Sequence, residues 1–170
     1  MHCLDISGND FPVFTLDVDD WTQPNCRYAD VGDMIDALNF TSFAILMINI
    51  RSCKKNFNSF IAHFGNILVR FSCIILTETW LTSDLDNIFN IPGFYSNNLY
   101  RDHYGGGIKL YIKNGIQSRL LNDFTFINEF FEILSVELLF GDHKAILTAI
   151  YHPPTPSIAL NYAFIDSLIF

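Results

Sequence analysis

The stretch Ser72-Cys-Ile-Ile-Leu-Thr-Glu78-Thr-Trp-Leu81 decides the fold of this chain, because a nearly apolar run ends abruptly in a carboxylate. Continuous apolar runs rich in β-branched residues are typical of strands that are covered on both faces. Open α/β sheets present their chemistry beyond the carboxyl ends of such strands. Glu78 is therefore a candidate functional residue, although its side chain could instead cap the turn that begins at Thr79.

The residues before this strand predict a strand-helix-strand unit. Phe43 to Ile50 is an apolar run of about eight residues, which suits a buried strand and falls well short of the roughly 20 that cross a bilayer. Between Asn56 and Phe71 the apolar residues recur with the period of one helical face. Because the crossover between parallel strands is right-handed, we expect Asn49 and Glu78 at the same edge of the sheet.

Shorter segments of alternating polarity follow Trp80 and predict antiparallel strands. The expected strands are Phe94–Arg101, Ile108–Lys113, Glu132–Phe140 and Ala145–Tyr151. Turns are expected at Gly105–Gly107, at the hairpin-type pair Asn114-Gly115 and at Gly141-Asp142. A strand-helix-strand unit followed by antiparallel strands predicts the α/β (α+β) class, as a sandwich of mixed sheets.

The net charge of −8 is concentrated at one end of the chain. Residues 1–40 contain eight acidic residues and one basic residue, Arg27, for a net −7, whereas residues 41–170 contain ten acidic and nine basic residues, for −1. Residues 1–25 are therefore expected to be an acidic, poorly ordered extension that repels phosphate. Residues 26–170 are expected to form a partial domain, with a short helical turn at Asp30–Asn39.

The amino terminus and the cysteines indicate the cellular compartment in which we expect the protein. The amino terminus lacks a basic start and an apolar core of signal-peptide length, so we expect an intracellular protein, nuclear or cytoplasmic, that is neither secreted nor membrane-bound. The cysteines have no metal-binding spacing and are expected to be reduced thiols.

A helical pattern begins at Asn161 and the chain stops on apolar residues, so we expect a fragment truncated at its C-terminus.

Three of the predicted buried strands end in, or just before, the polar residues Asn49, Glu78 and Tyr151. One carboxylate beside a neutral amide suits Mg²⁺, or Mn²⁺ in its place, because such an ion keeps its other positions for water and substrate phosphate. The same pattern could also arise in a sheet whose strand ends simply hydrogen-bond their loops. The sequence therefore predicts a polar cluster and leaves open whether it binds a metal.

Five blocks of sequence occur in an order that resembles a known family. They are Met47-Ile-Asn-Ile-Arg-Ser52, Leu76-Thr-Glu-Thr-Trp-Leu81, Tyr100-Arg-Asp-His-Tyr-Gly-Gly-Gly107, Phe131-Glu-Ile-Leu-Ser-Val-Glu137 and Tyr151-His-Pro-Pro154. Together they resemble the amino-terminal half of the endonuclease/exonuclease/phosphatase domain of non-LTR (LINE-like, Jockey-type) retrotransposons. The resemblance implies a deoxyribonuclease-I-like fold and a Mg²⁺-dependent enzyme that nicks target DNA to prime reverse transcription. It also implies a reverse transcriptase domain downstream on the same polyprotein.

The resemblance assigns a role to each residue of the polar cluster. It implies that Glu78 is a ligand of the catalytic metal, that Asn49 helps to hold the metal and the scissile phosphate, and that Tyr151 approaches the phosphate. Arg101 would shape the DNA-facing loop together with the glycines that follow it. His152 stands where the family often has arginine, which weakens phosphate attraction near neutral pH.

For several other polar residues the sequence allows both a functional and a purely structural interpretation. Arg51 could touch DNA phosphate or lie in a solvated loop. Tyr111, between two lysines on one face of its strand, could stack on a base, although strand-surface tyrosines are common. Glu132 and Glu137 are interpreted as acids that support the fold.

Two further blocks of the family do not occur in this chain. They are a G-D-x-N block, whose aspartate orients the attacking water, and an S-D-H block, whose histidine stabilises the phosphate. Hydrolysis needs a base and a charge-stabilising donor as well as a metal, so we expect the isolated chain to be inactive. The alternatives are a non-catalytic interaction module or decaying relic, and a phosphoesterase of the same superfamily.

Overall fold

The computed structural model describes residues 11–14, 26–29, 43–101, 105–128 and 131–152. Within them the protein is a mixed α/β structure made mostly of strands, with two four-stranded sheets, a two-stranded sheet and few helices. The helical segments predicted at Asp30–Asn39 and from Asn161 onward lie outside the described residues. Within the same described ranges, no helix combines the length and the apolar character needed to cross a membrane.

The first four-stranded sheet has the order β3-β4-β6-β5. Its parallel pair, β3 (Ile45–Asn49) and β4 (Cys73–Thr77), is connected by α2 (Cys53–Leu68), so the predicted strand-helix-strand unit is confirmed. Asn49 pairs with Thr77 in this register, one residue before Glu78. The strands β5 (Phe94–Leu99) and β6 (Ile108–Lys113) complete the sheet in antiparallel pairing.

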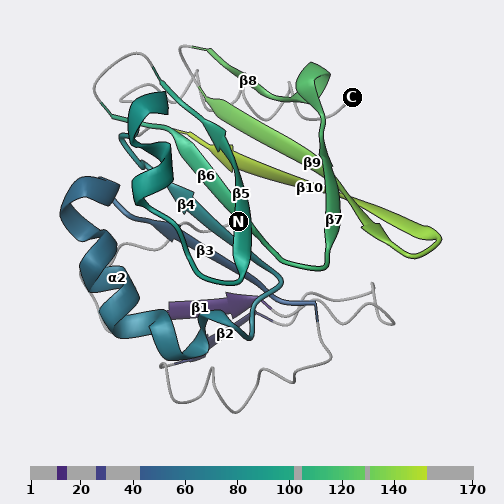
Figure 1. Cartoon of the computed structure of the whole chain (residues 1–170), viewed down its shortest axis with the longest axis horizontal. Coiled ribbons are helices and arrows are strands. Elements are labelled where there is room, and N and C mark those ends of the chain that lie inside the picture. Colours follow the sequence, from purple (N-terminus) through teal and green to yellow (C-terminus); the bar gives the residue numbers. More distant parts are fainter. Residues whose placement is uncertain (1–10, 15–25, 30–42, 102–104, 129–130, 153–170) are drawn as a thin grey trace.

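The second four-stranded sheet is built around the hairpin of β9 (Glu132–Phe140) and β10 (His143–Tyr151). The turn at Gly141 and Asp142 is confirmed, and it sets a register in which Tyr151 pairs with Glu132. The strands β7 (Gln117–Leu120) and β8 (Phe126–Ile127) both pair with β9. The tip of the hairpin projects beyond the other strands (Figure 1).

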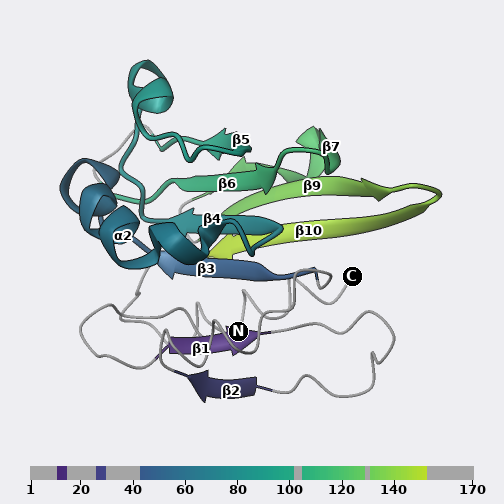
Figure 2. The same cartoon turned by 60° about the horizontal axis from the view of Figure 1, so that its bottom comes forward.

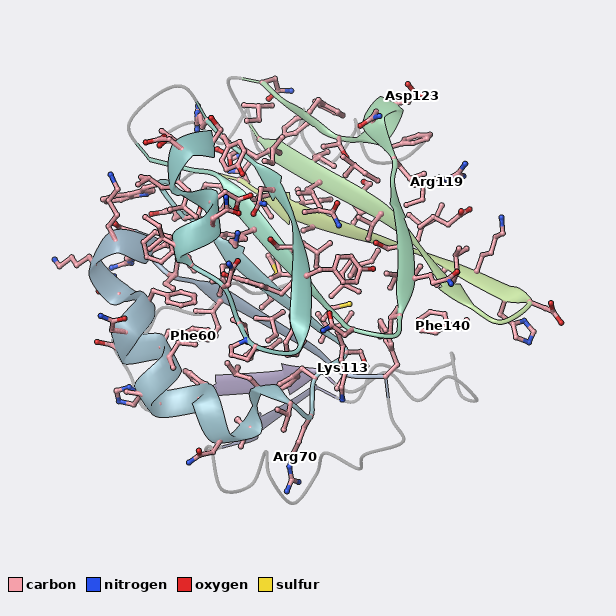
Figure 3. All side chains as sticks on the ribbon, viewed as in Figure 1. Phe60, Arg70, Lys113, Arg119, Asp123 and Phe140 are labelled. Atoms are coloured by element: carbon pink, nitrogen blue, oxygen red, sulfur yellow. The ribbon has the colours of Figure 1, made fainter. Side chains whose placement is uncertain are left out.

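The two four-stranded sheets and α2 form three layers. Helix α2 buries Phe57, Phe60 and Phe64 against the face of the first sheet that carries Ile74 and Leu76. The opposite face of that sheet packs on the second sheet, through a core described by Ile75, Ile108, Leu110, Ile112, Leu134, Val136 and Leu138. Figure 3 places Phe60 on the helix and Phe140 on the hairpin, at opposite sides of the molecule. The first sheet is therefore covered on both faces, as its continuous apolar strands predict.

A small antiparallel sheet pairs β1 (Phe11–Phe14) with β2 (Cys26–Ala29). Figure 2 shows both strands on the β3 side of the molecule. The sequence predicted no strand here, and β1 falls within the segment expected to be a poorly ordered extension. The rest of residues 1–25 lies outside the described residues, so the division at residue 26 stays a prediction.

Two expectations about β6 and its surroundings are wrong. The Asn114-Gly115 turn is present, but β6 and β7 do not pair across it, because the chain passes there from the first sheet to the second. Tyr111 is buried rather than on a strand surface, and so is its neighbour Lys109. The cause is that the face carrying both residues is covered by α2 and by the segment that contains the 3-10 helix η1 (Ser83–Ile88).

The burial of Lys109 is compensated by a specific partner. Its ammonium group, which is fully inaccessible to solvent, pairs with the carboxylate of Asp86 in η1, whose side chain is 28% exposed. Asp86 also accepts a hydrogen bond from Asn98 on β5, over 2.9 Å. These contacts attach η1 to the strands beneath it, and the alternation of β6 gave no sign of them.

Candidate active site

Three residues from separate strand ends meet at one carboxylate oxygen. Asn49 Nδ2 donates to Glu78 Oε1 over 3.2 Å, and the hydroxyl of Tyr151 donates to the same oxygen. Asn49 ends β3, Glu78 follows β4 and Tyr151 ends β10, so both large sheets contribute. The structure therefore brings together the three residues that the sequence singled out, whereas their role in catalysis stays a prediction.

The backbone around Glu78 is held in an unusual conformation. Glu78 and Trp80 have φ angles of +53°, and Arg51 and Ser52 in the neighbouring loop have +46° and +87°. Positive φ is costly for residues other than glycine and persists where neighbouring contacts enforce it. Here the two loops are joined by backbone hydrogen bonds, from Ser52 N to Glu78 O over 2.7 Å and from Cys53 N to Thr79 O over 2.9 Å. The segment that carries Glu78 is thus locked to the start of α2.

A turn formed by Gly105, Gly106 and Gly107 supports the same segment from the other side. The carbonyl of Gly106 accepts a hydrogen bond from Trp80 N over 2.9 Å, and that of Gly107 accepts one from Thr79 N over 3.2 Å. Gly106 and Gly107 have φ angles of +73° and +87°. A Cβ on Gly107 would lie 2.6 Å from Oγ1 of Thr79, so the close approach needs glycine.

Glu132 lies beneath this glycine turn and is fully buried. Its Oε2 accepts a hydrogen bond from Gly107 N over 2.6 Å, and its Oε1 accepts one from the guanidinium of Arg101 over 3.2 Å. Burial raises the pKa of Glu132 above its ordinary value, and the bond from Gly107 and the charge of Arg101 oppose that rise. The charge of Glu78 also raises the pKa of Glu132, so the two carboxylates belong to one electrostatic neighbourhood.

The three residues predicted to bind nucleic acid lie in different settings. Arg51 is exposed in the loop between β3 and α2. Arg101 is directed to Glu132, with 22% of its side chain exposed. His152 follows β10 and is half-buried. Contact of any of the three with DNA stays a prediction.

The polar cluster around Glu78 suits a cation that takes few ligands from the protein and the others from water and substrate. Within the part of the chain that the structure describes, the two hydrogen bonds to the Glu78 carboxylate both end on Oε1, so Oε2 is the oxygen that could bind an ion. Nδ2 of Asn49 donates to Glu78 and its Oδ1 accepts a hydrogen bond from Arg51 N over 3.1 Å, so this amide orients the carboxylate, whereas contact of Asn49 with a metal stays a prediction. Among the described residues, no group of three or more His, Cys, Asp or Glu forms a cage for a metal. One carboxylate suits Mg²⁺, which keeps several waters and often completes its shell with phosphate oxygens.

Glu132 is the functional candidate that the sequence interpretation missed. The sequence interpretation assigns Glu132 only to support of the fold, because the strand pattern alone does not show which of its two acids, Glu132 or Glu137, is buried. The Gly141-Asp142 turn could have indicated that Glu132 lies near the candidate site. Counting back equally from both sides of that two-residue turn places Glu132 opposite Tyr151, as the structure has it.

Comparison with known proteins adds no assignment to this geometry. No protein-family model matches the chain, and no curated protein matches it at a significant level.

Proposed function

We propose that this chain carries the metal-binding part of a Mg²⁺-dependent DNA endonuclease of the endonuclease/exonuclease/phosphatase type, from a non-LTR retrotransposon. In this proposal the whole enzyme nicks target DNA to prime reverse transcription. The isolated chain is inactive, because its sequence lacks the G-D-x-N and S-D-H blocks. The resemblance of the five sequence blocks names the family.

A single observation carries the proposal: Asn49 and Tyr151, which are far apart in the sequence, both converge on Glu78 Oε1. Asn49 and Tyr151 both donate to this oxygen, so they restrict the carboxylate to one orientation. A bound Mg²⁺ would supply charge neutralisation at the phosphate. The residues of this chain would hold the Glu78 carboxylate in one orientation, with Oε2 as the oxygen for the ion.

The test is a titration with Mn²⁺, followed by electron paramagnetic resonance of the free ion. We expect saturable binding by the wild-type chain and its loss in Glu78→Gln. Glutamine keeps an oxygen that can accept both hydrogen bonds, so this variant removes the charge and little else. The matched control is Glu137→Gln, because Glu137 lies on β9 and pairs instead with Arg119 and Lys144, over 3.2 and 3.6 Å. Equal Mn²⁺ affinity in wild type and Glu78→Gln would overturn the proposal.

The class of substrate is tested by measuring ligand binding, because the isolated chain is expected to have no catalytic activity. A short DNA duplex should bind more tightly when Mg²⁺ is added, and Glu78→Gln should remove that increase. If Mg²⁺ instead strengthens only the binding of a soluble inositol phosphate, the phosphoesterase alternative replaces the nuclease. Nicking of supercoiled plasmid that both EDTA and Glu78→Gln abolish would contradict the expected inactivity, yet it would support the nuclease site itself.

A further inference from the structure

We propose that Glu132 is a positioning residue of the candidate site, which clamps the glycine turn and through it holds Glu78 in place for a divalent cation. The inference rests on the proposed function, since it gives Glu132 a task in preparing the metal ligand. It assigns Glu132 no contact with metal or substrate.

The first step is the clamp itself. Both carboxylate oxygens of Glu132 are engaged, one by Gly107 N over 2.6 Å and the other by Arg101 over 3.2 Å. A fully buried carboxylate is tolerated only when such partners replace its hydration. Because both oxygens are in use, Glu132 is suited to hold its neighbours rather than to bind an ion.

The second step leads from the turn to Glu78. Gly106 and Gly107 accept backbone hydrogen bonds from Trp80 and Thr79, the residues that directly follow Glu78. Glu78 and Trp80 both have φ angles of +53°, which require enforcement from outside the segment. Release of the turn would therefore let Glu78 relax from the orientation that Asn49 and Tyr151 recognise.

The third step connects Glu132 to Tyr151. The two residues are partners in the β9–β10 ladder, and the Tyr151 hydroxyl donates to Glu78 Oε1. Glu132 thus lies between the glycine turn and the strand that delivers Tyr151. A Cβ on Gly106 would overlap Oε1 of Glu132, so the turn and the carboxylate are fitted to each other. One buried side chain links both supports of Glu78.

The experiment compares Glu132→Gln with Glu137→Gln in the full chain. Glutamine is close in shape, but its amide nitrogen faces a donor and so removes one of the two clamping bonds. The control makes the same change on the same strand, in an ion pair on the outer part of the sheet, where the Glu137 side chain is 16% exposed. The readouts are Mn²⁺ affinity, thermal unfolding, and the ¹⁹F resonance of Trp80 in protein labelled with 5-fluorotryptophan. The chain has two tryptophans, and Trp21→Phe assigns the signals.

We expect Mn²⁺ affinity to fall roughly 10- to 100-fold in Glu132→Gln, as is typical when the group behind a metal ligand is removed. The Trp80 resonance should shift in the same variant, and Glu137→Gln should change neither readout. Unchanged Mn²⁺ affinity and an unchanged Trp80 resonance in folded Glu132→Gln would overturn the inference.

Two outcomes separate this inference from the proposed function. If the wild-type chain binds no Mn²⁺, the proposed function fails, and the Trp80 resonance together with hydrogen exchange at the Thr79 and Trp80 amides still decides whether Glu132 clamps the turn. If Glu132→Gln does not fold, Arg101→Lys takes its place. That variant keeps both charges while losing the planar donor, and it should shift the Trp80 resonance in the same direction by less.

Discussion

Gly107 shows how little space separates the glycine turn from the segment that follows Glu78. Gly107 and Gly93 have the same φ angle, +87°, but a Cβ on Gly93 would meet nothing within 4 Å. Alanine at Gly93 should therefore cost only the left-handed conformation, about 1–2 kcal/mol. Alanine at Gly107 should cost about 1–3 kcal/mol more, from overlap with Thr79. Urea unfolding of both variants measures the difference, and equal losses would contradict the close approach.

The ion pair of Lys109 and Asp86 is asymmetric, because Lys109 is fully buried whereas Asp86 reaches solvent. We expect Asp86→Asn to lower the free energy of unfolding by about 3–5 kcal/mol, since it leaves a buried ammonium without its counter-ion. Lys109→Met should cost less, because water can hydrate the remaining carboxylate. Urea unfolding of both variants and the double variant tests this. A double variant no more stable than Asp86→Asn alone would contradict the explanation.

Glu132 makes a prediction about pH. Its pKa in the folded protein is raised above the ordinary value of 4.5, so the folded state binds this proton more tightly than the unfolded state does. Its contribution to stability is therefore greatest below that value and declines as pH rises through the folded pKa. The stability of wild type relative to Glu132→Gln should fall as pH increases above 4.5, measured by urea unfolding at successive pH values. A difference that stays constant or grows with pH would refute it.

At the scale of elements, the starts of α2 and β4 each bury a cysteine. Cys53 and Cys73 are free thiols with no exposed surface, and burial raises the pKa of each to about 12. Thiolates are the reactive species, so neither residue should react with iodoacetamide in the native protein at pH 8. Both should react together once urea unfolds the chain, as peptide mapping by mass spectrometry would show. Earlier labelling of Cys53 would reveal local opening at the start of α2.

The elements themselves were largely predictable, and their partners were less so. The ranges expected for β6 and β9 are those observed, because continuous or alternating apolar runs between turn residues define a strand locally. Neither the strand β7 nor its pairing with β9 was predicted, since Asn114-Gly115 has the composition of a hairpin turn yet joins two different sheets. Burial of Lys109 was missed for a similar reason. It depends on η1, a segment without a periodic pattern, covering that face of β6.

The part of the candidate site formed by the ends of β3 and β4 could be predicted from the sequence. The part that depends on how β9 and β10 are placed beside them could not. Asn49 and Glu78 follow from the geometry of a parallel strand pair. Tyr151 was expected as a strand end, although nothing in its own strand indicated that the second sheet would deliver it to Glu78. The hairpin turn places Glu132 opposite Tyr151, but the role of Glu132 also depends on its contact with the distant glycine turn, which no local pattern reveals.

At the scale of the whole molecule, the charge distribution opposes the proposed ligand. The net charge is −8, and the acids concentrate in residues 1–40. Changing Asp17, Asp19 and Asp20 to Asn would bring the net charge to −5 and should tighten DNA binding at low salt. Fluorescence anisotropy with a labelled duplex at two salt concentrations tests this. Because salt screens the repulsion, the gain should shrink at the higher concentration, and a gain independent of salt would contradict an electrostatic origin.

The β9–β10 hairpin has arms of equal length, nine residues each, and this equality has a practical consequence for engineering. Extra residues inserted between Gly141 and Asp142 lengthen only the projecting tip, so a peptide tag or a fluorescent reporter can be placed there without changing which residues face each other at the base. A single residue inserted within one arm would instead turn every following side chain to the opposite face. The pairing of Glu132 with Tyr151 thus requires equal numbers of residues in the two arms, whereas the number of residues in the tip can change.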